Sequence, residues 1–251
     1  MNRAEGQRDF APGSPPDWSF FDRVYCISLV NREDRRAAAR VQFARVGLAE
    51  RVEFFLVEKD RENPERGIYE SHILCLNRAL AEGARHILLF EDDVVFARFS
   101  ADRLARMIAF LRAHEWDAFF PGCIASRLRK VPAAPVARAR YRCLSHSYAV
   151  NRDFAAHLAR RPWAGTAYDD FLREQTASFA VFAACPMFAF QSDAPSDNDA
   201  WLHLDRRRRR LGGLMFLQKV NEFRLRFFWP IVLLHGVVFG ALAALLWRLW
   251  S

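Results

Sequence analysis

The sequence lacks the cysteine spacing of a disulfide-stabilised protein or of a thiolate zinc site. Its five cysteines are odd in number and scattered, without a C-x-x-C pair, and its seven histidines are dispersed. This pattern fits a reducing compartment. The amino-terminal residues also lack the apolar segment of a secretory signal, so we expect residues 1–20 to form a flexible leader.

A basic face of the kind that binds nucleic acid is also absent from most of the chain. The net charge is +8, but residues 206–251 hold nine of the 37 Lys and Arg residues and only one of the 29 acidic residues. The remainder is therefore charge-balanced. This distribution argues against a nucleic acid partner for the main domain and indicates that the carboxyl-terminal segment has a partner of its own.

One long apolar run is present at residues 227–247, in which His235 is the only ionisable side chain. About 20 apolar residues in a helix span the roughly 30 Å hydrocarbon core of a bilayer. We therefore predict a transmembrane or membrane-anchoring helix at 227–250, with a buried core helix or a re-entrant hairpin as the alternative. The preceding basic amphipathic segment, 206–226, predicts contacts with membrane lipids and a main domain facing the cytoplasm. For its five arginines at 206–210, a solvated loop or an RNA contact is the alternative.

The main domain, residues 21–205, alternates short apolar strands with helical segments. The clearest strand-like runs are 23–29, 52–57 and 86–90. Such alternation predicts parallel βαβ units, hence an α/β fold with a Rossmann-type mixed sheet flanked by helices. Residues 122–140 are basic and predict an irregular loop over a site. In these sheets the sites lie just beyond the carboxyl ends of strands.

Three successive carboxylates, Glu91, Asp92 and Asp93, follow the third of these strands. Like charges this close repel one another and resist burial unless a positive partner is present. A divalent cation would satisfy them, because Mn²⁺ and Mg²⁺ prefer oxygen ligands. In an extended segment Glu91 and Asp93 point to one side and Asp92 to the other, which favours Asp93 as a metal ligand with Glu91 beside it. An exposed acidic turn is the alternative.

The order of the motifs resembles glycosyltransferase family 25, which includes bacterial lipooligosaccharide galactosyltransferases and collagen galactosyltransferases. The quoted stretches are "VYCISLVNREDRRAAARVQFARVGL", "GIYESHILCLNRALAEGARHILLFEDDVVF", "SHSYAVNRDFAAHL", "YDDFL" and "FQSDAPSDN", and they cover residues 21–198. The resemblance implies a GT-A-like fold and a metal-dependent, inverting transfer of a hexose, galactose, from a UDP-sugar. It also implies a saccharide or glycolipid acceptor, such as a lipopolysaccharide core.

The resemblance also implies roles for individual residues. Asp169 in "YDDFL" would be the general base, with a helix cap as the alternative. Asp93 would bind Mn²⁺ or Mg²⁺, with Glu91 beside the metal or at the ribose. One of Arg32, Arg35 and Arg36 would meet the diphosphate, unless they belong to a solvated helix surface. The other donor-binding candidates are Ser71 and His72, at the expected start of a helix, Asp92, which would orient the donor sugar, and Gln191.

Two departures from the family pattern keep other hypotheses open. Glu70 replaces the glycine that the family commonly carries before its Ser-His pair, and the tryptophan usual on the following helix is missing. The main alternative is a catalytically inactive, transferase-like membrane scaffold or glycan-binding protein. A metal-dependent phosphodiesterase that uses the same carboxylates is a further alternative.

Overall fold

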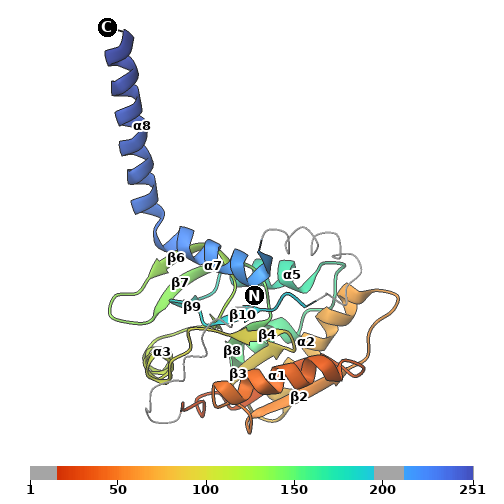
Figure 1. The fold of residues 1–251 in the computed structure, drawn as a ribbon. Coiled ribbons are helices and arrows are strands. Elements are labelled where there is room, and N and C mark those ends of the chain that lie inside the picture. Colours follow the sequence, from red (N-terminus) through yellow and green to blue (C-terminus); the bar gives the residue numbers. More distant parts are fainter. Residues whose placement is uncertain (1–15, 195–211, 251) are drawn as a thin grey trace, which may run out of the picture.

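A large mixed sheet forms the centre of the computed structural model, which describes residues 16–194 and 212–250. The strands of this sheet are β1 (Arg23–Leu29), β2 (Val52–Val57), β3 (His86–Glu91), β5 (Ala118–Phe120), β6 (Ile124–Lys130), β7 (Val136–Cys143), β8 (Ser147–Asn151) and β9 (Val181–Ala184). Its eight strands follow the order β2-β1-β3-β8-β5-β9-β7-β6. Figure 1 shows the strands within the body of the molecule and helix α8 (Phe228–Trp250) projecting from it. A second, two-stranded sheet pairs β4 (Val94–Phe96) with β10 (Ala189–Gln191).

Helices cover both faces of the large sheet. The described helices are α1 (Glu33–Arg45), α2 (Pro64–Ala81), α3 (Ala101–Ala113), α4 (Arg152–Ala159), α5 (Tyr168–Thr176), α7 (Gly213–Arg226) and α8 (Phe228–Trp250). The buried side chains of α1 and α3 share one hydrophobic cluster, and those of α2, α4 and α5 share the other. β1 pairs in parallel with both β2 and β3. The prediction of an α/β fold with a mixed sheet flanked by helices is therefore confirmed.

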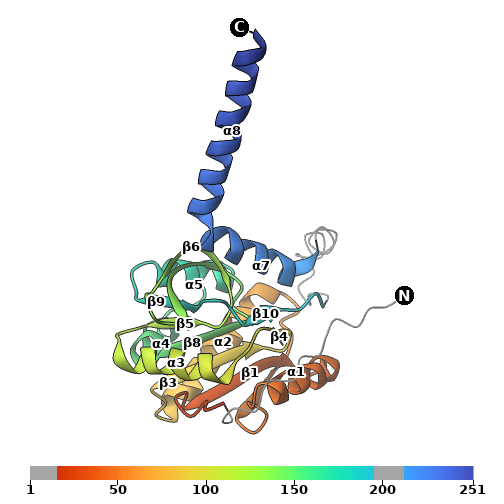
Figure 2. The ribbon, with the colours of Figure 1, turned by 60° about the vertical axis from the view of Figure 1, so that its left-hand side comes forward.

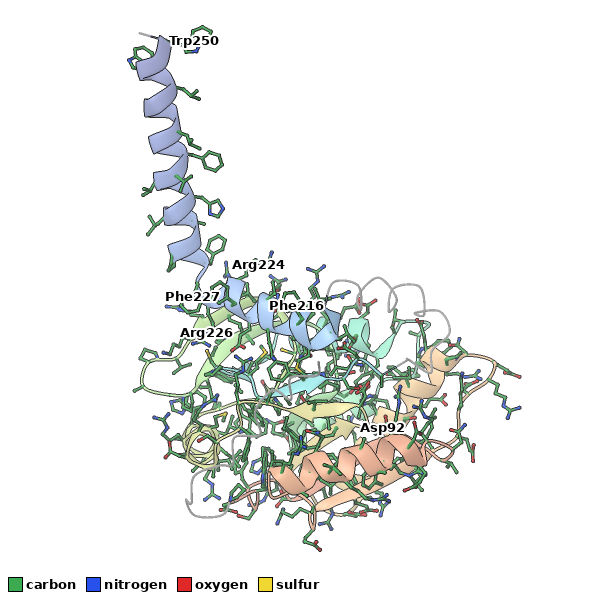
Figure 3. The ribbon with its side chains drawn as sticks, viewed as in Figure 1. Asp92, Phe216, Arg224, Arg226, Phe227 and Trp250 are labelled. Atoms are coloured by element: carbon green, nitrogen blue, oxygen red, sulfur yellow. The ribbon has the colours of Figure 1, made fainter. Side chains whose placement is uncertain are left out.

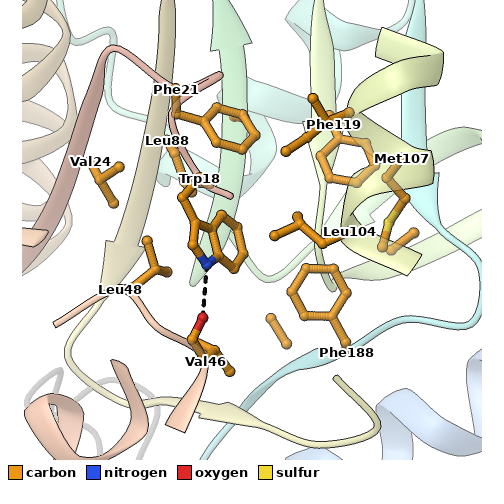
Figure 4. Close-up of a cluster of buried hydrophobic side chains, with 14 of the residues drawn as sticks. Trp18, Phe21, Val24, Val46, Leu48, Leu88, Leu104, Met107, Phe119 and Phe188 are labelled. Atoms are coloured by element: carbon orange, nitrogen blue, oxygen red, sulfur yellow. Dashed lines mark hydrogen bonds between the residues drawn. The ribbon is translucent and has the colours of Figure 1, made fainter. Parts of the chain in front are cut away.

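The core extends into the segment that the sequence assigned to the leader. Trp18 is 2% exposed, and its indole N–H donates to the Val46 carbonyl at 2.8 Å (Figure 4). Its ring also stacks on Phe99. The folded domain therefore includes residues before Phe21. Residues 1–15 of the predicted leader lie outside the described residues.

Two strands replace the irregular loop that we predicted for residues 122–140. β6 and β7 pair antiparallel, so this prediction is wrong. The reason is visible in the alternation of "SRLRK" and "VARARYRC", in which arginines occupy every second position. Such a period of two gives one apolar and one charged face to a strand. The high charge concealed this pattern.

α7 packs against β6 and β10 through polar side chains that are almost fully buried. Glu222 is 2% exposed and accepts hydrogen bonds from the Met187 N–H and from Arg98, both at 2.9 Å. Gln218 accepts from the Gln191 N–H at 2.9 Å. Figure 2 shows α7 lying across the top of the body, with α8 leaving from its end. The segment predicted to lie along a membrane thus completes the body.

We predict that Glu222→Ala destabilises the protein by about 2–4 kcal/mol, because it leaves Arg98 and the Met187 N–H without their buried acceptor. Glu222→Gln keeps one oxygen acceptor and should cost less. Urea unfolding followed by circular dichroism measures both variants. The matched control, Glu115→Ala at an exposed position, should change stability by less than about 0.5 kcal/mol. Equal stability of Glu222→Ala and the wild type would show that this residue does not hold α7.

α8 projects from the body, with Trp250 at its outer tip (Figure 3). Among residues 16–194 and 212–250, no helix combines the length and the apolar character that crossing a membrane requires. The predicted transmembrane helix at 227–250 is therefore wrong, and so is the localisation drawn from it, a membrane protein whose main domain faces the cytoplasm. The arginine run at 206–210 lies outside the described residues.

Candidate functional site

A cavity of about 460 Å³ opens at the carboxyl ends of β1, β2 and β3. Its lining comes from these strand ends, from α2, from residues 142–145 and from the start of α5. This position beyond the strand ends is where open α/β sheets bind their ligands. Of the nine predicted site residues, all but Arg32 line the cavity: Arg35, Ser71, His72, Glu91, Asp92, Asp93, Asp169 and Gln191.

The three carboxylates do not alternate along an extended strand, as we had assumed. β3 ends at Glu91, and Asp92 and Asp93 form a turn before β4. Asp92 accepts hydrogen bonds from the Ser28 hydroxyl at 2.6 Å and from Arg35 at 3.2 Å. Burial raises the pKa of Asp92, while Ser28 and Arg35 favour its carboxylate. The hydrogen bonds of Asp92 therefore tie the turn after β3 to β1 and α1.

Of the three carboxylates, Asp93 has the fewest hydrogen-bond partners to stabilise its negative charge. Its Oδ2 accepts a hydrogen bond from the Gln191 side chain at 2.9 Å, but its buried Oδ1 has no hydrogen-bond partner within the described residues. Burial and the neighbouring charge of Glu91 raise the pKa of Asp93 to about 7. Arg35 and Gln191 favour the charged form of Asp93 but do not outweigh burial and Glu91, so its carboxylate is costly. A bound cation would remove this cost.

Glu91 lies beside Asp93 but in a more favourable environment. It accepts a hydrogen bond from the Ser145 hydroxyl at 3.0 Å, and its Oε1 lies 3.6 Å from Nε2 of His72. Burial favours the neutral acid, but His72, His146 and Ser145 together outweigh burial and lower the pKa of Glu91. Glu91 is therefore better stabilised as a carboxylate than Asp93 is.

His72 and Ser71 lie in the middle of α2 and not at its start, so that prediction is wrong. The helix begins at Pro64, and Asn63 caps it by accepting from the Arg66 N–H. The His72 ring stacks on Tyr168 at 4.0 Å, and its Nδ1 lies 3.1 Å from the Tyr148 hydroxyl. The Ser71 hydroxyl donates to the Gly67 carbonyl. Its lone pairs can still accept from a ligand.

The arginines after β1 have different surroundings. Arg35 faces Asp92 at the cavity wall. Arg32 forms a two-pronged ion pair with the exposed Asp34 and does not line the cavity. Arg36, which is 6% exposed, donates to Ser28 and to backbone carbonyls at the end of β1. The geometry thus favours Arg35 for an anionic ligand.

Asp169 lines the cavity from the first turn of α5. Its Oδ1 accepts from the Tyr141 hydroxyl at 2.5 Å, and its Oδ2 accepts from the Leu144 N–H at 2.9 Å. The N-cap residue of α5 is Ala167, so these contacts, and not helix capping, hold the carboxylate. Burial raises the pKa of Asp169 although Tyr141 and Leu144 stabilise its charged form. A carboxylate with a raised pKa is better suited to accept a proton near neutral pH.

The carboxylate oxygens at the site fit a hard cation, such as Mg²⁺, that binds together with a phosphate-bearing substrate. No group of three or more His, Cys, Asp or Glu side chains in metal-binding geometry occurs within the part of the chain that the structure describes. Mg²⁺ is commonly bound by one or two carboxylates together with substrate phosphates and water. Asp93 and Glu91 provide two carboxylates, and the unpartnered Oδ1 of Asp93 provides a ligand atom.

Several residues at this site escaped the sequence analysis. Ser28 and Ser145 bond to the carboxylates, and Tyr141 holds Asp169. Each lies between 28 and 64 positions from its partner along the chain. No local spacing could have revealed these pairs. The contact of Gln218 with the backbone of Gln191 was equally hidden, because α7 had been assigned to a membrane surface.

No protein-family model and no curated protein sequence matches the chain. Among solved structures, A197 from STIV superposes with a TM-score of 0.46 at 11% identity, over 67% of this chain and 85% of that chain. UDP-glucose pyrophosphorylase complexed with UDP-glucose gives 0.40 at 12% identity, over 75% and 81%. Mannose-1-phosphate geranyltransferase from Thermus thermophilus gives 0.40 at 15%, over 66% and 74%. Similarities at this level carry no argument about activity, so the function is argued from the site.

Proposed function

We propose that the chain is a metal-dependent glycosyltransferase with a GT-A-like fold, similar to family 25. It would transfer a hexose, galactose by resemblance, from a UDP-sugar to a hydroxyl of a saccharide or glycolipid, such as a lipopolysaccharide core. The observation that carries the proposal is Asp93, whose buried Oδ1 has no hydrogen-bond partner among the described residues and whose pKa is raised beside Glu91. These groups line a cavity of a size that suits a nucleotide sugar.

The donor would occupy the wall formed by the strand ends and α2. Asp93 and Glu91 would hold Mn²⁺ or Mg²⁺, which neutralises the charge that develops on a departing diphosphate. Arg35 adds a guanidinium at the same wall, held in place by Asp92. Gln191 holds Asp93 in position from the neighbouring strand β10. Together these groups favour binding of a pyrophosphate over binding of a neutral ligand.

The acceptor would enter from the wall that carries Asp169. Its hydroxyl oxygen attacks the anomeric carbon of the donor and forms the new C–O bond, while the bond from that carbon to the diphosphate oxygen breaks. The electron pair leaves with UDP, and the hydroxyl proton passes to the Asp169 carboxylate. Attack on the face opposite the leaving group inverts the anomeric configuration.

A panel of UDP-sugars tests the proposal with the full chain. UDP-galactose, UDP-glucose and UDP-N-acetylglucosamine are each incubated with the protein and Mn²⁺, and UDP release and thermal stabilisation are recorded. We expect one donor to stabilise the protein in a saturable manner and to release UDP slowly even without an acceptor. If the protein neither binds nor hydrolyses any of these donors, the proposal of a nucleotide-sugar enzyme is contradicted.

A further inference from the structure

Five arginines share one exposed face of the β6–β7 hairpin, and we call this set the arginine ladder. Its members are Arg127, Arg129, Arg138, Arg140 and Arg142. Arg127 lies directly opposite Arg140, and Arg129 lies directly opposite Arg138. Arg142 is the next exposed arginine of β7 after Arg138 and Arg140, at a point where the pairing with β6 becomes irregular.

The ladder has no counter-charge of its own. From Ala118 to Asn151 the chain contains six Lys or Arg residues and no Asp or Glu. Within the described residues, no acidic side chain forms an ion pair with a ladder guanidinium. The guanidinium of Arg138 lies 5.9 Å from the centre of the Phe182 ring. Like charges placed directly opposite each other destabilise a strand pair. The hairpin therefore carries an energetic cost that an anionic ligand would remove.

Protection of a sheet edge does not account for the ladder. Charged side chains on an edge strand discourage pairing with other chains. β6 is the edge strand of the sheet, but β7 lies inside it and contributes three of the five arginines. On the opposite face of the hairpin, Leu128 and Ala139 pack against the same hydrophobic cluster as Met215 and Leu225 of α7, and α7 contacts β6. The ladder face therefore points away from α7.

The ladder leads into the cavity. Arg142 lines the cavity wall, and the chain continues from it through Cys143, Leu144 and Ser145, which line the same wall. The Leu144 N–H and the Tyr141 hydroxyl of this segment both bond to Asp169. A chain-like ligand bound along the ladder would thus place its end beside the proposed base.

We infer that the arginine ladder binds a polyanionic saccharide and guides its terminal sugar to Asp169. The inference rests on the proposed function and names the acceptor class as a glycan that carries phosphate or carboxylate groups. Guanidinium groups bind both anions through paired hydrogen bonds. Neither strand places an aromatic side chain on the ladder face, which disfavours stacking on the bases of single-stranded nucleic acid. A flat lipid surface would not reach into the cavity.

Binding of an oligogalacturonate, a saccharide with one carboxylate per sugar, tests the inference against a neutral maltooligosaccharide of equal length. Titration calorimetry uses the full chain, Arg138→Gln/Arg140→Gln, and the control Arg45→Gln/Arg106→Gln, which removes two exposed arginines from α1 and α3. We expect the wild type and the control to bind only the oligogalacturonate, with an affinity that falls as salt rises. The ladder variant should bind at least about tenfold more weakly.

The ladder variant should fold, because it removes opposed like charges, and its melting temperature should equal or exceed that of the wild type. Its thermal stabilisation by the UDP-sugar should be unchanged. Equal binding of the oligogalacturonate by variant and wild type, or binding of the neutral saccharide alone, would overturn the inference. So would tighter binding to single-stranded RNA or to phosphatidylglycerol vesicles. If the wild type binds oligogalacturonate but no UDP-sugar, the ladder is still a glycan-binding site. The glycan can then no longer be assigned as the acceptor of a sugar transfer, so that part of the inference is overturned.

Discussion

Asp93→Asn is expected to lower UDP-sugar turnover by at least about 1,000-fold, because it removes one of two carboxylates proposed to hold the cation. The amide keeps the size of the side chain and can still accept from Gln191, so the fold should survive. Release of UDP in the presence of saturating Mn²⁺ measures the loss. Asp102→Asn, a control at an exposed carboxylate on α3, should leave turnover unchanged. Normal turnover by the Asp93 variant would refute the metal assignment.

Although Asp93→Asn should lower turnover, we expect it to raise the stability of the metal-free protein at high pH. The pKa of Asp93 in the folded chain is raised to about 7 from an ordinary value of 3.8. The folded state therefore holds its proton more tightly than the unfolded state, so without metal this group makes stability fall as pH rises from about 4 to about 7. The neutral amide of the Asp93→Asn variant carries no such cost.

Chemical unfolding in the presence of a chelator measures this effect. We expect Asp93→Asn to be more stable than the wild type at pH 8, by roughly 1–4 kcal/mol, and to lose this advantage near pH 4. Added Mn²⁺ should stabilise the wild type at pH 8 and have a weaker effect below pH 6, where Asp93 is protonated. A variant less stable than the wild type at pH 8 would show that the carboxylate is already compensated within the fold.

Asp169→Asn is expected to lower sugar transfer by roughly 10²–10⁴-fold, the usual range for loss of a general base. Donor affinity should be preserved, because Asp169 is not one of the proposed metal ligands and its own hydrogen bonds are with Tyr141 and the Leu144 N–H. The measurement is transfer to an acceptor alongside thermal stabilisation by the UDP-sugar. The transfer rate of the wild type should also fall as Asp169 becomes protonated at low pH.

The adjacent Asp170 provides the matched comparison. Its carboxylate pairs with Arg173 and is 51% exposed. Asp170→Asn should therefore lose much less transfer than Asp169→Asn. Equal losses at the two positions would indicate that the start of α5, and not one carboxylate, supports the reaction. Full transfer by Asp169→Asn would exclude it as the base.

The first half of the fold could be predicted because its signals are local. The apolar runs of β1, β2 and β3 have strand length, and the helices between them carry periodic apolar residues. We placed the start of this helix at Ser71 and His72, but α2 begins at Pro64 with Asn63 as its cap. The charged residues around Asn63 and Pro64 conceal this signal. The β6–β7 hairpin was missed because arginine at alternate positions was read as charge and not as periodicity.

The site was predictable as a set of residues and not as an arrangement. The acidic tripeptide is recognisable by its position after a buried strand, and eight of the nine candidates line one cavity. Which carboxylate lacks a partner depends on contacts that no local pattern contains. Gln191 reaches Asp93 because β10 pairs with β4, and Ser145 reaches Glu91 because β8 lies beside β3.

The most direct test of the central claim is a crystal structure of the full chain with UDP and Mn²⁺. We predict one ion at about 2.0–2.2 Å from a carboxylate oxygen of Asp93, in contact with the diphosphate and with Glu91 beside it. Nucleotide bound elsewhere, or Asp93 still paired only with Gln191 and no ion nearby, would contradict the account.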